Sequence, residues 1–238
     1  MDFWNAYSKI CGRSRESNLT TLDSTTTRQA GAKGVPRGVR GHRIRDPEKT
    51  RERRREILMG AARAFARSGY DATNMDQIAH ECGLAKGHIY HYFLSKEEIF
   101  TEIRADAVNH AIERLSLIAP SAADNPALAL RKAIAALIAR VFELPGSYEP
   151  VLADPVSLSV ANRRRIRTLQ RRYERMFASI LRAGIDQGIF VRGEPKLMMF
   201  VILRAANTVA GWYREGGKWK PQWIVEQVTE QLVRSVKA

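Results

Sequence analysis

The feature that most constrains the fold is a run of helix start and stop signals between residues 53 and 103. Apolar residues recur at helical spacing from Ile57 to Ala66, which predicts a helix with one buried face. Gly69 is placed to end that helix, because glycine readily adopts the left-handed conformation common after a helix. The segment therefore opens with an amphipathic helix.

Two further helices are predicted directly after it. Thr73 stands at capping-box spacing from Asp76, so we expect Thr73 to begin the second helix. Residues 85–91 have room for only about two helical turns before Ser95, which we expect to cap a longer helix. A helix, a tight turn containing glycine and a short second helix form a helix-turn-helix, which places its second helix in the major groove of DNA.

The short second helix carries side chains suited to contact DNA. Several offer hydrogen-bond donors or flat rings: Lys86, His88, Tyr90 and His91. Gly87 lets the backbone approach a groove closely, and since glycine costs a helix about 1 kcal/mol relative to alanine, we expect a functional reason for it. Tyr90 has two interpretations, because packing in the module core suits it as well as contact with DNA.

Motifs for metal binding and catalysis do not accompany these residues. His88 and His91 stand three residues apart, as two metal ligands on one helical face would, but no Cys-x-x-Cys or His-Glu-x-x-His arrangement supports them. A nucleophile elbow, a Walker loop and a dinucleotide fingerprint are also missing from the sequence. We therefore expect no metal, no cofactor and no enzymatic activity.

The charge of the chain favours a polyanionic partner. Its 39 lysines and arginines exceed its 25 aspartates and glutamates, which gives a formal net charge of +14 over 238 residues. Such an excess attracts nucleic acid or anionic membrane, and charge alone does not choose between them. No segment approaches the roughly 20 apolar residues of a membrane span, so we expect a cytoplasmic protein without membrane contact. A structural disulfide between Cys11 and Cys82 is not expected.

Residues 1–50 show no helical or strand periodicity and are predicted to form a disordered basic arm. The arm either follows the DNA backbone or a minor groove, or is a solvated tail or the product of an upstream start codon. The remainder is expected to divide into a DNA-binding domain over residues 51–98, with the helix-turn-helix at about 75–94, and a second domain over residues 99–238.

The second domain is predicted to be helical throughout. Helices are expected from Ser95 to about Leu117, from Ala127 to Phe142, from Val160 to at least Gly184, from Pro195 to Tyr213 and from Pro221 towards Val236. No segment shows the alternation of a strand. The fold class is therefore all-α, with an N-terminal three-helix module and a C-terminal helical domain.

The helix predicted from Val160 holds an unusual run of arginines, among them Arg163, Arg167 and Arg171. Several lie off the apolar stripe of that helix, so one interpretation is a solvated face. The other is an acidic ligand whose apolar part enters the helical core while its phosphates or carboxylate pair with arginines at the entrance.

The N-terminal module resembles the DNA-binding module of the tetracycline-repressor (TetR) family. The resemblance rests on an ordered set of residues: Ala62, Phe65, Gly69, Thr73, Ile78, Ala79, Gly83, Gly87, Tyr90, Tyr92, Phe93, Lys96 and Glu97. Aromatic, glycine and lysine positions all fall in register with the helix caps. The resemblance implies an operator of double-stranded DNA as partner.

The family pattern assigns DNA contacts to these positions: Thr73, Ala85, Lys86, Gly87, His88, Tyr90, His91 and Lys96. It implies that His88 lies near base edges and that Thr73 and Lys96 meet flanking phosphates. Ala85 departs from the pattern, because the family usually has serine or threonine there. A hydroxyl cap and a phosphate contact are therefore missing, and Lys86 is expected to supply that contact by charge.

The C-terminal part is similar to TetR-type repressors that respond to acyl-CoA thioesters, including those governing steroid-ring and aromatic degradation. The similarity rests on a Tyr-Glu pair, a G-x-x-x-G-x-F element and a WY-x-x-GG element. It implies an acyl-CoA effector that contacts Arg163, Arg167, Arg171, Tyr173, Phe177, Asn207 and Trp212. It also implies a homodimer through the last two helices. The alternative is that the apolar residues of these helices only pack in the core of a single chain.

Together these features predict a ligand-responsive transcriptional repressor that binds a palindromic operator as a homodimer. A small effector in the C-terminal core is expected to release it, through the helix from Ser95 that links the two domains. The alternative is a sequence-tolerant nucleic-acid-binding protein driven by the basic arm.

Overall fold

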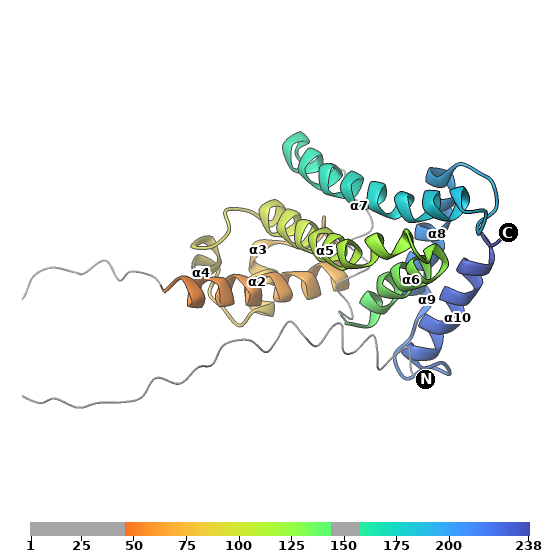
Figure 1. The fold of residues 1–238 in the computed structure, drawn as a ribbon. Helices are drawn as coiled ribbons and strands as arrows, with labels where there is room; N and C mark the ends of the chain where they lie inside the picture. The colour runs from red at the N-terminus through yellow and green to blue at the C-terminus, as the bar shows by residue number, and fades with distance from the viewer. Residues whose placement is uncertain (1–45, 144–157) are drawn as a thin grey trace, which may run out of the picture. The chain divides into compact units, whose positions relative to one another are not determined.

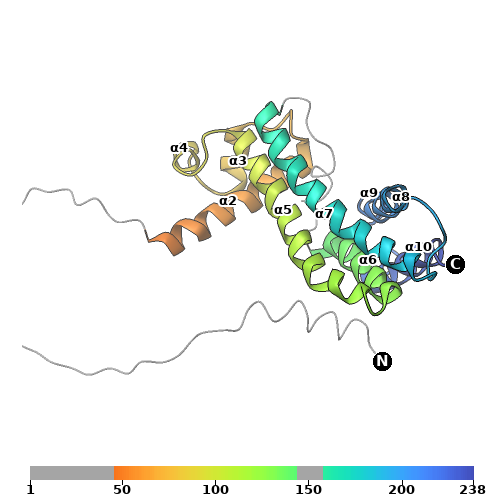
Figure 2. The same cartoon turned by 45° about the horizontal axis from the view of Figure 1, so that its top comes forward.

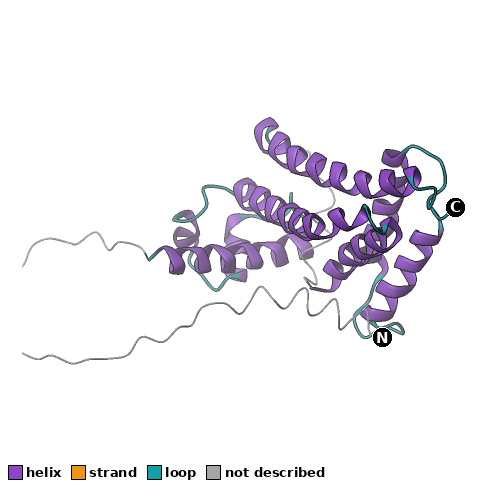
Figure 3. Cartoon of the chain, viewed as in Figure 1, coloured by secondary structure: helices purple, strands orange, loops and turns teal. Residues whose placement is uncertain are grey.

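The structure is a computed structural model that describes residues 46–143 and 158–238 (Figure 1). Its helices are α2 (Pro47–Ser68), α3 (Met75–Glu81), α4 (Lys86–Tyr90), α5 (Lys96–Ile118), α6 (Pro126–Glu143), α7 (Val160–Asp186), α8 (Pro195–Asn207), α9 (Val209–Trp212) and α10 (Pro221–Arg234), with a 3-10 turn η1 (Ala119–Ala122). Figure 3 shows helices joined by loops through these ranges, which confirms the all-α prediction. The predicted arm lies outside them over residues 1–45.

Helix α2 begins earlier than the sequence predicts. Asp46 caps it, because its carboxylate accepts a hydrogen bond from the backbone N–H of Glu48 at 3.0 Å. Pro47 takes the first helical position, where a missing N–H costs nothing. Residues 47–50 were assigned to the arm and are helical instead.

Helix α3 also has a different cap from the one expected. The Asn74 side chain accepts from the Gln77 N–H at 2.9 Å, and the Gln77 side chain accepts from the Asn74 N–H at 2.8 Å, which completes a capping box. Thr73 is only 1% exposed, and its hydroxyl donates to the carbonyl of Gly69 at 2.6 Å. The capping role predicted for Thr73 is therefore wrong, because its hydroxyl satisfies a carbonyl after the end of α2.

The core of the N-terminal module is built around three aromatic rings in contact. The ring of Phe100 lies 5.7 Å from that of Phe65 and 4.8 Å from that of Tyr70, centroid to centroid, both in edge-on contact. Two residues from far along the chain, Leu158 and Ile166, belong to the same buried cluster. The module is thus closed by the start of α7 as well as by its own helices.

Helices α5 and α7 connect the module to the C-terminal part and run side by side (Figures 1 and 2). Helix α7 packs also on α6 and α8, and α10 covers α6. The helix predicted from Pro195 to Tyr213 is interrupted at Thr208, where the cap between α8 and α9 lies. Within residues 46–143 and 158–238, no helix has both the length and the apolar character needed to cross a bilayer.

The end of α7 depends on a close contact between Gly184 and Phe190. A Cβ atom on Gly184 would lie 2.0 Å from the Phe190 ring, so only glycine leaves room for that side chain. Both residues are buried. The contact explains why the G-x-x-x-G-x-F element needs its first glycine.

Candidate functional site

Helix α4 presents the surface predicted to contact DNA. Ile89 is fully buried and holds the helix on the module, whereas Lys86, Gly87, His88, Tyr90 and His91 are exposed. Tyr90 is 43% exposed, so its ring is accessible from solvent. Ala85 stands at the N-cap with no side-chain hydrogen bond, as expected from its missing hydroxyl.

Lys86 is paired with a carboxylate of the preceding helix. Its Nζ atom lies 2.8 Å from Oδ2 of Asp76, and both side chains are exposed. The hydrogen bond to Asp76 raises the pKa of Lys86 above its usual value. Lys86 is therefore a cation at the start of α4 that is already oriented by α3.

The structure gives Thr73 and Lys96 partners within the chain instead of leaving them free for the phosphates that the family pattern predicts. Thr73 is buried and uses its hydroxyl on a carbonyl, as described above. The Nζ atom of Lys96 donates to the carbonyls of Tyr70, Asp71 and Thr73 at 3.0, 3.1 and 2.8 Å. An ammonium group has three protons, so these bonds occupy all of its donors. Both side chains secure the turn between α2 and α3.

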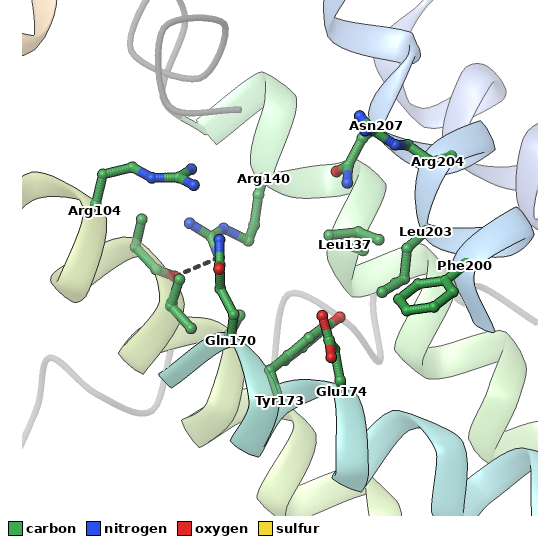
Figure 4. Close-up of a pocket in the computed structure, with 13 residues that line it drawn as sticks. Arg104, Leu137, Arg140, Gln170, Tyr173, Glu174, Phe200, Leu203, Arg204 and Asn207 are labelled. Atoms are coloured by element: carbon green, nitrogen blue, oxygen red, sulfur yellow. Dashed lines mark hydrogen bonds between the residues drawn. The ribbon is translucent and has the colours of Figure 1, made fainter. Parts of the chain in front are cut away.

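A cavity of about 360 Å³ lies between α5, α6, α7 and α8 (Figure 4). Its apolar lining comes from Ala107, Val108, Ala111, Leu137, Phe200 and Leu203, and its polar lining from Arg104, Arg140, Gln170, Tyr173, Glu174, Arg204 and Asn207. A cavity of this size, lined by both apolar side chains and converging polar groups, has the character of a small-molecule site. Among the described residues that line it, Glu174 is the single carboxylate.

Two of the arginines that line the cavity are buried and bring positive charge into it. Arg104 on α5 and Arg140 on α6 are only 5% and 7% exposed, and Figure 4 shows their guanidinium groups reaching into the same region, above Gln170. Arg140 donates to the carbonyl of Ala107 at 2.6 Å, which fixes its direction. Like charges held close together away from water favour an anionic group between or beside them.

Neither of these arginines was among the ligand contacts predicted from the sequence. Arg140 stands in the apolar run from Ile134 to Val141, and a charged residue inside such a run is a signal that was available. Arg104 gives no comparable signal, because charged residues surround it along α5.

The ligand residues predicted from the resemblance divide into three groups. Tyr173 and Asn207 line the cavity. The arginines do not line it: Arg163 donates to the carbonyl of Leu158 at 3.0 Å, and Arg167 and Arg171 are exposed on α7.

The remaining two ligand predictions are contradicted as cavity contacts. Phe177 is fully buried in the core and does not line the cavity, because its position on α7 faces the packed interior. Trp212 is 43% exposed and meets the ring of Trp219 edge-on at 6.4 Å, outside the cavity.

Exposed apolar side chains lie on α8 and on the segment from Trp212 to Trp223. The rings of Trp219 and Trp223 stack at 5.7 Å, next to Trp212, and all three are exposed. Helix α8 adds exposed Leu197 and Val201. Large exposed apolar side chains gathered in this way mark a surface that binds another molecule.

Known protein families match both parts of the chain. Residues 57–103 match the family described as bacterial regulatory proteins, tetR family, and residues 123–236 match the tetracyclin repressor-like C-terminal domain. The chain belongs to the TetR family. It is a DNA-binding transcriptional regulator and not an enzyme, and the family confirms the N-terminal helix-turn-helix domain and the helical C-terminal domain.

Individual TetR regulators are similar to this chain over about three quarters of its length. The transcriptional repressor KstR2 of Rhodococcus jostii RHA1 is 30% identical over 181 residues, which cover 74% of this chain and 86% of KstR2. The structure of KstR2 of Mycobacterium tuberculosis has a TM-score of 0.68 at 26% identity and covers 78% of this chain and 95% of its own. AibR, solved with isovaleryl coenzyme A and operator DNA, has a TM-score of 0.67 at 24% identity, over 78% of this chain and 98% of AibR.

Proposed function

We propose that this TetR regulator is a repressor that binds a palindromic operator as a homodimer and releases it when an acyl-CoA thioester occupies the cavity. The observation that carries the proposal is the lining of the cavity, in which apolar side chains stand beside the buried Arg104 and Arg140. Such a lining suits a ligand that is apolar in one part and anionic in another. AibR, a structural relative, holds isovaleryl coenzyme A.

The phosphates of the ligand are assigned to exposed arginines of α7. Arg167 and Arg171 stand four residues apart, so they follow one edge of the helix. That edge adjoins the one from which Gln170 and Glu174 line the cavity. A ligand tail that leaves the cavity over this edge meets two guanidinium groups, whose forked donors match phosphate oxygens.

DNA recognition is assigned to α4. His88 and His91 are exposed donors or acceptors for base edges, and Tyr90 offers a ring and a hydroxyl. Lys86 supplies charge for a phosphate, and Gly87 allows the helix backbone to come close to the groove. Ala85, exposed at the N-cap of α4, stays in the proposed set, which therefore differs from the sequence-based set by Thr73 and Lys96.

The apolar surface on α8 and residues 212–223 is assigned to the dimer interface. Its three exposed tryptophans give it large contact area, and aromatic residues are enriched in interface cores. A twofold pair places two recognition helices about 34–36 Å apart, one turn of DNA, and so accounts for a palindromic operator.

A thermal-shift screen followed by operator release tests the effector. Isovaleryl-CoA, longer acyl-CoA thioesters, free CoA and the free acids are compared, and an acyl-CoA is expected to raise the melting temperature and to free operator DNA. At a hundredfold excess over its dissociation constant, a ligand specific for the native state adds about 2.7 kcal/mol to stability. If no acyl-CoA in this panel changes the melting temperature or the binding of operator DNA, the effector proposal is wrong.

Matched variants locate the phosphates on α7. The double variant Arg167→Ala, Arg171→Ala is expected to weaken acyl-CoA binding about tenfold or more, because charge-assisted hydrogen bonds are lost. Arg172→Ala, Arg182→Ala removes the same charge from other exposed positions of α7 and is expected to leave binding unchanged. Equal losses in both doubles indicate a general charge effect.

A further inference from the structure

The start of α7 forms part of the DNA-binding module, although the rest of α7 forms the wall of the cavity. Leu158, just before the helix, and Ile166, in its second turn, are buried in the same cluster as Ile57 and Phe65 of α2. The chain therefore returns to the module after building α6. Any shift of this segment changes the packing of the module core, because cores are close-packed.

A carboxylate of the module holds the first turn of α7. One Glu97 oxygen, Oε1, accepts the backbone N–H of Ser159 at 2.8 Å and the side-chain amide of Asn162 at 2.7 Å. Hydrogen bonding to the Ser159 side chain, to the Asn162 side chain and to the Ser159 backbone N–H, in this order of effect, lowers the pKa of Glu97. A carboxylate at a helix N-terminus is further stabilised by the free N–H groups there.

Glu97 also stands next to the lysine that organises the module. Lys96 ties the turn between α2 and α3 through three carbonyls, and Glu97 follows it in the first turn of α5. Adjacent residues thus fix the α2–α3 turn on one side and α7 on the other. The position of α7 and that of the helix-turn-helix are set from the same turn.

The same helix reaches the cavity a short distance further on. Gln170, Tyr173 and Glu174 line the cavity about one to two turns beyond Ile166 and about three to four turns beyond Ser159, at 3.6 residues per turn. No proline or glycine interrupts α7 before Gly184. A helix without such breaks moves as a stiff unit, so displacement at the cavity carries to its first turn.

We infer that α7 couples the effector cavity to the DNA-binding module, and that Glu97 is the positioning residue that makes this coupling. The inference rests on the proposed function, because it concerns how an effector in that cavity reaches α4. Helix α5 joins the two parts covalently and stays continuous. The contact between Glu97 and the start of α7 is non-covalent, so it is open to breakage without unfolding either part. An effector that binds the two arrangements of this contact with different affinity shifts the DNA-binding site.

The test measures operator affinity of the full chain with and without saturating acyl-CoA, for the wild type, Glu97→Ala, Glu97→Gln and the control Glu113→Ala. Glu113 is an exposed carboxylate of α5 that pairs with His110. We expect Glu97→Ala to bind acyl-CoA, to bind operator without effector about as weakly as the liganded wild type does, and to show an effector-induced loss of operator affinity about tenfold smaller than that of the wild type. Glu97→Gln, which keeps an oxygen acceptor, is expected to recover part of the response.

An undiminished response in Glu97→Ala overturns the inference. If no acyl-CoA changes the operator affinity of the wild type, the effector proposal fails. Amide hydrogen exchange then tests the contact between Glu97 and α7 without an effector. Operator DNA is expected to slow amide exchange at residues 159–163 in the wild type and in Glu113→Ala, and not in Glu97→Ala. The same protection in all three proteins overturns the coupling without any effector being involved.

Discussion

The Nζ atom of Lys86 lies 2.8 Å from the Oδ2 atom of Asp76, so the cation at the start of the recognition helix is held by an anion of the helix before it. A DNA phosphate that approaches Lys86 competes with that carboxylate. The pair is exposed, and exposed ion pairs add little to stability. Its main consequence is therefore for DNA affinity.

Removing the competing carboxylate should strengthen DNA binding. Asp76→Asn is expected to raise the affinity for operator and scrambled duplex alike, since phosphate contacts do not select sequence. Lys86→Ala is expected to lower both and to reduce the slope of log affinity against log salt by about 1. Anisotropy titrations at several salt concentrations measure both effects, and an unchanged slope for Lys86→Ala excludes its phosphate contact.

Gly87→Ala should separate DNA binding from stability. A Cβ atom at Gly87 meets no atom within 4 Å, and alanine favours a helix over glycine by about 1 kcal/mol, so the free energy of unfolding should stay equal or rise. Operator affinity should fall, because the methyl group stands between α4 and the groove. Urea unfolding and operator titration of the same sample measure the two effects; undiminished affinity shows that α4 does not need a glycine there.

Gly184→Ala should have the opposite pattern. Its Cβ atom would lie 2.0 Å from the buried ring of Phe190, so we expect a loss of roughly 1–3 kcal/mol in the free energy of unfolding, as overpacked cores show. Operator affinity per folded molecule should change little. Urea denaturation of wild type and variant measures the loss, and a fully stable variant contradicts the close packing at the end of α7.

Lys96→Met should destabilise the module without altering its salt dependence. The change leaves the carbonyls of Tyr70, Asp71 and Thr73 without their ammonium donor, and we expect a loss of roughly 1–3 kcal/mol, the range for a hydrogen bond to a charged group. Thermal unfolding measures the loss. The slope of log operator affinity against log salt is the control. A slope reduced by about 1 in Lys96→Met would show that Lys96 does contact a phosphate.

The helices were largely predictable because their start signals are local. Ser95 caps α5, and Pro195 and Pro221 begin α8 and α10, as the sequence indicates. The cap of α3 was not predictable in this way, since Thr73 and Asn74 are neighbours and both residue types cap helices. Asn74 is the cap because the Thr73 hydroxyl donates its hydrogen bond to the carbonyl of Gly69.

The cavity was harder to predict than the helices, because it depends on which helix faces meet. Tyr173 and Asn207 were found through a resemblance, whereas Arg104 and Arg140 come from α5 and α6 and converge only in the folded chain. The same limit applies to Glu97. Its contact with Ser159 joins residues 62 positions apart, and periodicity along one helix carries no information about such a pair.

The stacked pair of Trp219 and Trp223, with Trp212 beside it, places three of the four tryptophans of the chain on one exposed surface. Indole emission shifts to shorter wavelength when the ring leaves water. Association of two subunits through this surface would therefore be visible as a spectral change on dilution, so the tryptophans are an optical reporter for the proposed dimer.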